Sequence, residues 1–120
     1  MTQEQALYIE LTKHYFPAGI FDYFEMVNVE IESDSINAYL DESNNLDNKF
    51  EGEKLISKGF YPVVSLYDFP IREKKLVLHL RRRKWIVEST GKTVSNDYKV
   101  AAPGTHYTQG FATFLKGVFG

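Results

Sequence analysis

The spacing of hydrophobic residues predicts two helical segments at the start of the chain and a hairpin after them. Thr2 followed by Gln5 is typical of a capping box, and the apolar positions that follow predict a helix ending near Tyr15. Pro17 favours the first turn of a second short helix. The period then changes to two, which predicts a β-hairpin over 26–41.

The second half of the chain is richer in predicted strands. Residues 42–54 are polar and predict a long loop. Strands are expected over 60–67, 75–87 and 92–100, with a hairpin turn at Thr90-Gly91 between the last two. Alternation within the longest strand divides its side chains between two faces, with Leu76, Leu78 and Leu80 on one and Val77, His79 and Arg81 on the other.

A final helix is predicted after Thr105 or Thr108. Its apolar residues recur at helical spacing and form one stripe to be buried, consisting of Phe111, Phe114, Leu115, Val118 and Phe119. Together these elements predict an α+β fold, with an antiparallel sheet of about five strands, N-terminal helices and a C-terminal helix. The length of 120 residues is that of a single domain, which we expect to span 1–120.

The composition is that of a folded chain without cysteine chemistry. Hydrophobic residues make up 43% and aromatic residues 15%, which is enough apolar material for one core. The absence of cysteine excludes disulfides, thiolate zinc sites and cysteine nucleophiles. The first residues lack the pattern of a signal peptide, and no apolar stretch approaches the roughly 20 residues of a membrane helix. We therefore expect a cytoplasmic protein that contacts no membrane.

The net charge of −2 conceals a strong asymmetry between the two halves of the chain. Residues 1–53 hold 12 Asp and Glu against 2 Lys, a balance of −10. Residues 54–120 hold 12 Lys and Arg against 4 Asp and Glu, a balance of +8. This asymmetry favours contact with nucleic acid, but it is equally typical of two surfaces that neutralise each other within one fold.

Four consecutive cations followed by a tryptophan form the sharpest local feature: Arg81, Arg82, Arg83, Lys84 and Trp85. Burying four charges would be prohibitive, so these side chains must be solvated or paired. Arginine forks on a strand suit the oxygens of DNA phosphates. Further cations near this run in the sequence would support a basic stripe, namely Arg72, Lys74, Lys75 and Lys92. The alternative is a charged edge strand that prevents aggregation, with Trp85 in the core.

Catalytic chemistry is not indicated by any motif. The three histidines, at 14, 79 and 106, lack the spacing of a metal site, and His79 is expected to be a surface or packing residue. The serines lack a nucleophile motif, and no glycine-rich phosphate loop is present. The sequence therefore predicts no catalytic residue, no bound metal and no cofactor, and the protein is not expected to be an enzyme.

Several short motifs follow one another in a characteristic order, at 16–24, 57–62, 68–72, 76–85, 90–92, 104–105 and 111–116. In this order they resemble the N-terminal region of insertion-sequence transposases of Bacteroides-type bacteria, over roughly residues 16–116. A more distant resemblance is to the zinc-ribbon module of a wider group of transposases, where a cysteine knuckle follows the basic strand. Here 85–95 contain no cysteine, and the turn at Thr90-Gly91 stands in its place, so no zinc is expected.

The resemblance implies a non-catalytic module that binds DNA at transposon ends or supports assembly. Strand cleavage would then belong to a downstream catalytic transposase polypeptide. The residues expected to contact the DNA backbone are Arg81, Arg82, Arg83 and Lys84, supported by Arg72, Lys74, Lys75 and Lys92. The alternative is a protein-interaction module that self-associates as a homo-oligomer or docks on the catalytic chain through Phe111, Phe114, Leu115 and Val118.

Overall fold

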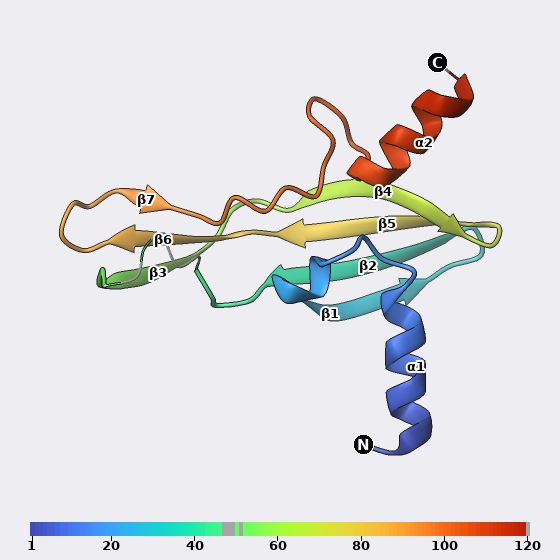
Figure 1. The fold of residues 1–120 in the computed structure, drawn as a ribbon, viewed down its shortest axis with the longest axis horizontal. Helices are drawn as coiled ribbons and strands as arrows, with labels where there is room; N and C mark the ends of the chain where they lie inside the picture. Colours follow the sequence, from blue (N-terminus) through green and yellow to red (C-terminus); the bar gives the residue numbers. More distant parts are fainter. Residues whose placement is uncertain (47–49, 51, 120) are drawn as a thin grey trace.

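The fold combines two flat β-sheets with helices at the two ends of the chain (Figure 1). The structure is a computed structural model and describes residues 1–46, 50 and 52–119. Helix α1 spans Gln3–Lys13, a short 3-10 helix η1 spans Ile20–Asp22, and helix α2 spans Gln109–Phe119. The predicted α+β class with N-terminal and C-terminal helices is confirmed.

Within the described residues, seven strands form the two sheets. Sheet A has the order β1-β2-β5-β4, and its strands are β1 (Phe24–Ile31), β2 (Ser35–Glu42), β4 (Val64–Ile71) and β5 (Lys74–Arg81). Sheet B has the order β3-β6-β7, and its strands are β3 (Leu55–Phe60), β6 (Arg83–Val87) and β7 (Thr93–Val94). The hairpin expected over 26–41 is formed by β1 and β2.

The expected single antiparallel sheet of about five strands differs from this arrangement in two respects. There are two sheets instead of one, and β2 pairs with β5 in parallel. The reason is the path of the chain between these strands. After β2 it leaves sheet A, forms β3 in sheet B and returns as β4, which then turns directly into β5. Alternation of side chains cannot reveal such a crossover, because it is the same in parallel and antiparallel strands.

The strand expected over 75–87 is divided at Arg82, where the chain passes from β5 in sheet A to β6 in sheet B. The strand expected over 92–100 is also shorter, because only β7 pairs with β6. Beyond it, the buried side chain of Asn96 donates to the Glu42 carboxylate, at 2.7 Å, instead of pointing to solvent. Side-chain hydrogen bonds of this kind compete with strand pairing.

The boundaries of the remaining strands also differ from those predicted. The strand expected over 60–67 is replaced by the end of β3 and the start of β4, with Pro62 between them. Residues 68–70, which follow the expected strand, lie inside β4, where the pairing with β5 is irregular between Asp68 and Ile71. Of the long loop expected over 42–54, residues 47–49 and 51 lie outside the described residues.

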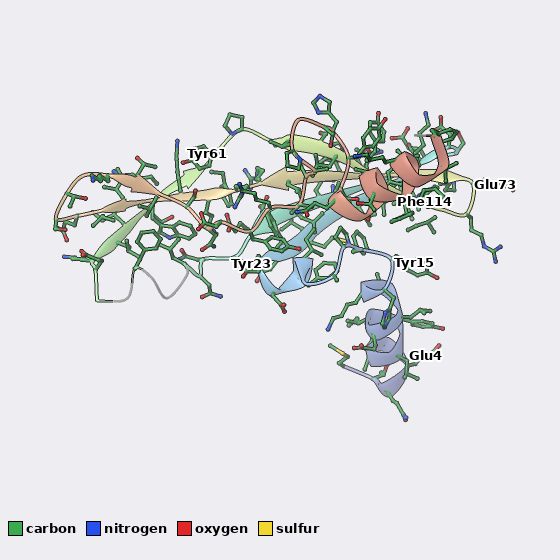
Figure 2. All side chains as sticks on the ribbon, turned by 45° about the horizontal axis from the view of Figure 1, so that its top comes forward. Glu4, Tyr15, Tyr23, Tyr61, Glu73 and Phe114 are labelled. Carbon is green, nitrogen blue, oxygen red and sulfur yellow. The ribbon has the colours of Figure 1, made fainter. Side chains whose placement is uncertain are left out.

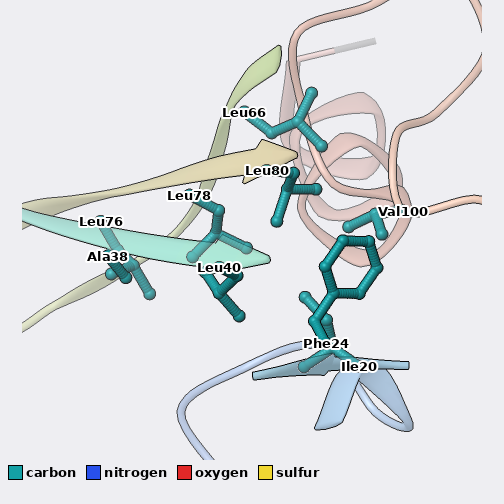
Figure 3. Packing of buried hydrophobic residues seen from close by; sticks show 9 residues of the cluster. All are labelled: Ile20, Phe24, Ala38, Leu40, Leu66, Leu76, Leu78, Leu80 and Val100. Carbon is teal, nitrogen blue, oxygen red and sulfur yellow. The ribbon is translucent and has the colours of Figure 1, made fainter. Parts of the chain in front are cut away.

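The hydrophobic core covers one face of sheet A (Figure 3). Leu76, Leu78 and Leu80 of β5 are all buried on this face, as their alternation predicted. Ile20 of η1 and Phe24 of β1 pack over them, with Ala38, Leu40, Leu66 and Val100 completing the cluster. The predicted capping box of α1 is present, since Thr2 and Gln5 exchange hydrogen bonds of 2.8 and 3.1 Å. Neither helix contributes a buried residue to the core, among the residues described.

The β4–β5 turn contains an unfavourable backbone conformation. Arg72 has φ of 58°, in the left-handed region that costs a residue with a side chain about 1–2 kcal/mol. We expect Arg72→Gly to raise the free energy of unfolding by about 0.5–1 kcal/mol, because glycine adopts this φ without strain but loses more entropy on folding. Thermal or urea unfolding measures the change, and Arg72→Ala, which keeps the strain, is the matched control. Equal stability of the two variants would contradict this account of the turn.

Candidate nucleic-acid interface

The basic run crosses the junction between the two sheets, and its first member is held by an ion pair. Arg81, the last residue of β5, donates from Nε and Nη2 to the two carboxylate oxygens of Asp41 on β2, at 2.7 and 2.6 Å. The parallel pairing of β2 with β5 places these two residues directly opposite each other. The hydrogen bond from Arg81 lowers the pKa of the Asp41 carboxyl, so Asp41 stays ionised and fixes the guanidinium in one orientation.

Two aromatic rings order further cations of the run. The guanidinium carbons of Arg81 and Arg83 lie 4.2 and 4.6 Å from the centre of the Phe60 ring. The ammonium of Lys84 lies 5.3 Å from the centre of the Tyr61 ring. Cations at these distances are attracted by the negative face of the ring, and they lose less conformational entropy when they bind an anion.

Arg82 differs from its neighbours because its side chain turns inward. Its Nη2 donates to the backbone oxygen of Asn96. Its Nε is buried without a hydrogen-bond partner among the described residues. Its own carbonyl accepts from the backbone amide of Tyr61, at 2.7 Å. Arg82 therefore ties the segment after β7 to the junction, and it is the cation of the run least able to reach a phosphate.

A buried glutamate lies beneath the run. Glu42, at the end of β2, is 1% exposed. Its Oε1 accepts from the backbone amide of Arg83 at 2.8 Å, its Oε2 accepts from Asn96 at 2.7 Å, and its backbone oxygen accepts from Nε of Arg83 at 2.7 Å. Sequence reasoning missed this residue, because its partners are 41 and 54 positions away along the chain.

Trp85 belongs to the interior, as the alternative interpretation of the run held. Its side chain is 4% exposed, and its Nε1 donates to the Asn44 side chain at 3.1 Å. The ring is therefore not available to stack on a base. The indole hydrogen bond also connects β6 to the segment that follows β2, on the same side as Glu42.

The supporting cations do not gather with the run. Lys74 and Lys75 lie at the start of β5, about 20 Å from Arg81 at the usual rise along a strand, and Arg72 lies in the turn before them. Figure 2 shows this separation, with Glu73 at the β4–β5 turn and Tyr61 toward the opposite end of the molecule. Lys74 is further engaged, because its ammonium donates to the backbone oxygens of Glu32 and Ser33. Lys92 is exposed beyond the end of β6.

The predicted docking stripe on α2 is divided between two environments. Phe111 and Phe114 lie against Phe69 of β4, with ring centres 5.2 and 5.5 Å away. Leu115 is half-buried, but Phe114 and Val118 are 51% and 57% exposed. The helix thus attaches to the sheet through its first turns, and its last turn presents apolar side chains to solvent.

A hydrogen-bonded group of polar side chains around His79, on the face of sheet A opposite the core, was also missed by sequence reasoning. His79 lies between Ser65 Oγ, 2.7 Å from its Nδ1, and Asn37 Oδ1, 2.8 Å from its Nε2. The ring of Tyr39 stacks on the imidazole, with centres 4.6 Å apart. Alternation correctly predicted that His79 shares a face with Arg81, but its partners come from β2 and β4, whose register the sequence does not display.

Asp68 of β4 is buried beside the start of α2, where it accepts from the Thr108 hydroxyl at 2.8 Å. Burial raises the pKa of this carboxyl above its ordinary value, although the bonds from Thr108 and the Phe69 amide oppose the shift. It lines a cavity of about 620 Å³ together with Phe16, Phe69, Tyr98 and Lys99. The Asp68–Thr108 bond therefore fixes the start of α2 to the sheet.

The raised pKa predicts a pH dependence with a definite sign. The folded state holds the Asp68 proton more tightly than the unfolded state, so this residue's contribution to stability is lost as pH rises above about 4. We expect Asp68→Asn, which keeps an acceptor for Thr108, to become more stable relative to the unchanged protein between about pH 3 and about pH 6. Urea unfolding across this range measures the difference. A constant difference would show that the carboxyl is not shifted.

Metal and membrane sites are not found among the described residues. No group of three or more His, Cys, Asp or Glu side chains in this part of the chain could hold a metal ion. No helix in the described ranges is long and apolar enough to cross a membrane. Comparison with protein-family models, curated proteins and solved structures gives no match.

Proposed function

We propose that the chain is a non-catalytic module of an insertion-sequence transposase that binds DNA or supports assembly. The observation that carries the proposal is the excess of cations at the junction of the two sheets. The run brings four cations to this junction, Arg81, Arg82, Arg83 and Lys84; there Arg81 pairs with Asp41, and the backbone amide of Arg83 donates to Glu42. The resemblance of the sequence motifs to transposase N-terminal regions supports the identity of the DNA as transposon ends.

In this proposal the four cations have different tasks, which their contacts support. Arg81 and Lys84 are the phosphate ligands, because Asp41 and Tyr61 orient them without enclosing them. Arg83, whose guanidinium lies over the Phe60 ring, adds positive charge beside them. Arg82 holds the junction together through its hydrogen bond to the backbone oxygen of Asn96. Contacts to phosphates position a protein on DNA without reading its sequence. The module thus supplies backbone affinity, and base recognition belongs to another part of the transposition complex.

A charge-matched comparison of variants tests this assignment. Arg81→Gln combined with Lys84→Gln should weaken binding to a labelled duplex about tenfold or more, because two phosphate contacts are lost. Lys13→Gln combined with Lys116→Gln removes the same charge from the two helices and should change affinity by less than about threefold. Fluorescence anisotropy gives both constants, and circular dichroism verifies the fold. Equal losses for both pairs would contradict the junction as the DNA site.

A second candidate function is that of a protein-interaction module. The exposed apolar side chains at the end of α2 favour it, since Val118 and Phe119 are 57% and 82% exposed, and Phe114 stays 51% exposed although it touches Phe69. A downstream catalytic transposase polypeptide is the partner that the sequence motifs suggest. Such an interface would be insensitive to salt, whereas phosphate contacts weaken steeply as salt rises.

A further inference from the structure

Both α-helices stand away from the body of the protein with apolar side chains exposed. No residue of α1 is buried, and Leu7 and Leu11 are 63% and 56% exposed. An isolated helix of this length is marginal in water, so its stability depends on packing. In Figure 1, α1 extends beyond the β1 edge of sheet A, and α2 extends beyond the β4 edge. The two exposed surfaces therefore cannot meet within one chain.

The accessible surface is larger than that of a compact monomer. The chain exposes 8390 Å², whereas a globular protein of 13.9 kDa exposes about 6,700 Å². The radius of gyration is 16.5 Å, against about 14 Å for a compact domain of this length. The excess area of about 1,700 Å² exceeds the roughly 800 Å² that each partner buries in a standard protein–protein interface.

A groove beside α1 has the shape and lining to accept a helix. Its volume is about 440 Å³, and it lies between α1 and the β1 edge of the sheet. Its lining is mainly apolar, with Lys13 and Glu25 as its charged members and Tyr8, Ile9, Phe21, Phe24 and Met26 among the others. The exposed face of α2 offers the complementary side chains, Phe114, Val118 and Phe119.

We propose that α2 of a second copy of this chain occupies the groove beside α1, and that the exchange is reciprocal. A twofold axis that runs parallel to the strands over one face of sheet A stacks the two sheets and places the β1 edge of each chain over the β4 edge of the other, so each α1 comes beside the partner's α2. Both exposed surfaces are then covered at once, and the assembly closes as a dimer. Charge also favours this pairing, because α1 and β1 carry four glutamates, at 4, 10, 25 and 30, against Lys13, while α2 carries the single positive charge of Lys116.

The absence of natural cysteine allows a direct test by disulfide trapping. Chains carrying Ile9→Cys are mixed with chains carrying Val118→Cys and oxidised. We expect a disulfide-linked dimer from this mixture, and none when Ile9→Cys is mixed with Lys92→Cys at the distant end of sheet B. A double variant with both Ile9→Cys and Val118→Cys should form links between chains only. Failure of the first mixture to cross-link would overturn the proposal.

Light scattering of the unchanged protein supplies an independent measurement. We expect a mass twice the 13.9 kDa of one chain. Val118→Glu should raise the dissociation constant of the dimer at least about tenfold, whereas Thr113→Glu on another side of α2 should change it little. A monomer at all concentrations, or a dimer equally affected by both substitutions, would overturn the proposal. The result is independent of DNA affinity, so it does not depend on the proposed function.

Discussion

Glu42→Ala should destabilise the protein by about 2–5 kcal/mol, because it leaves two buried donors without their acceptor, although Glu42 lies outside every motif singled out in the sequence. The carboxylate is 1% exposed and joins β2 to the start of β6 and to the segment after β7. Alanine would leave the Arg83 amide and the Asn96 side chain buried without their acceptor. Unmet buried donors are costly because water cannot replace the lost partner. Urea unfolding measures the change.

Glu42→Gln is the informative control. Both carboxylate oxygens of Glu42 accept hydrogen bonds, whereas a glutamine presents one acceptor and one donating amide group. Either the Arg83 amide or the Asn96 side chain would therefore face the donating amide group of the glutamine. We expect the free energy of unfolding to fall by about 1–3 kcal/mol, less than in Glu42→Ala. Asp41→Asn, at the neighbouring and more exposed carboxylate, should cost less than either. Equal stability of Glu42→Ala and the unchanged protein would show that this network does not hold the sheets together.

Trp85→Ala should also cost about 3–5 kcal/mol, because it removes a large buried side chain and leaves a cavity in sheet B. Trp85→Phe keeps most of the apolar volume but loses the hydrogen bond to Asn44, and we expect a loss of about 1–2 kcal/mol. Thermal unfolding monitored by circular dichroism compares the two. A Trp85→Ala variant as stable as the unchanged protein would mean that the indole is solvated. The ring would then be available to stack on a DNA base.

Local patterns in the sequence predicted those features that depend on residues close together along the chain. The capping box needs only Thr2 and Gln5, and it is present. The faces of β5 follow from alternation, so the buried leucines and the outward position of Arg81 were both predictable. The hydrophobic period also identified α2, although it could not show that Val118 stays exposed, because exposure depends on where the helix lies relative to the sheet.

Features that depend on which strands are neighbours, and on their register, could not be predicted from the sequence. The pairing of Arg81 with Asp41 spans 40 positions and requires β2 and β5 to be parallel neighbours. Neither partner carries a signal for the other, and many carboxylates in the acidic half could have served equally well. The division of the strand at Arg82 has the same origin, since it depends on Asn96 and Tyr61 from distant segments.

This difference changes the meaning of the basic run. In the sequence it predicts four cations on one strand that are solvated or paired and suited to DNA phosphates. In the structure each cation has its own partner, so the run stabilises the junction as well as charging it. A variant that removes all the arginines together would lose fold and affinity at once, which is why substitution of Arg81 and Lys84 alone is the sharper test.

The central claim, that the junction contacts DNA phosphates, is tested most directly by the salt dependence of duplex binding by the unchanged protein. The protein is titrated into a labelled duplex at several salt concentrations, and fluorescence anisotropy gives the association constant at each. The logarithm of this constant is plotted against the logarithm of the salt concentration. Two to four phosphate contacts predict a slope of about −2 to −4, shared by a transposon-end duplex and a scrambled one. A slope near zero, or no binding at low salt, would contradict the claim and leave protein interaction as the function.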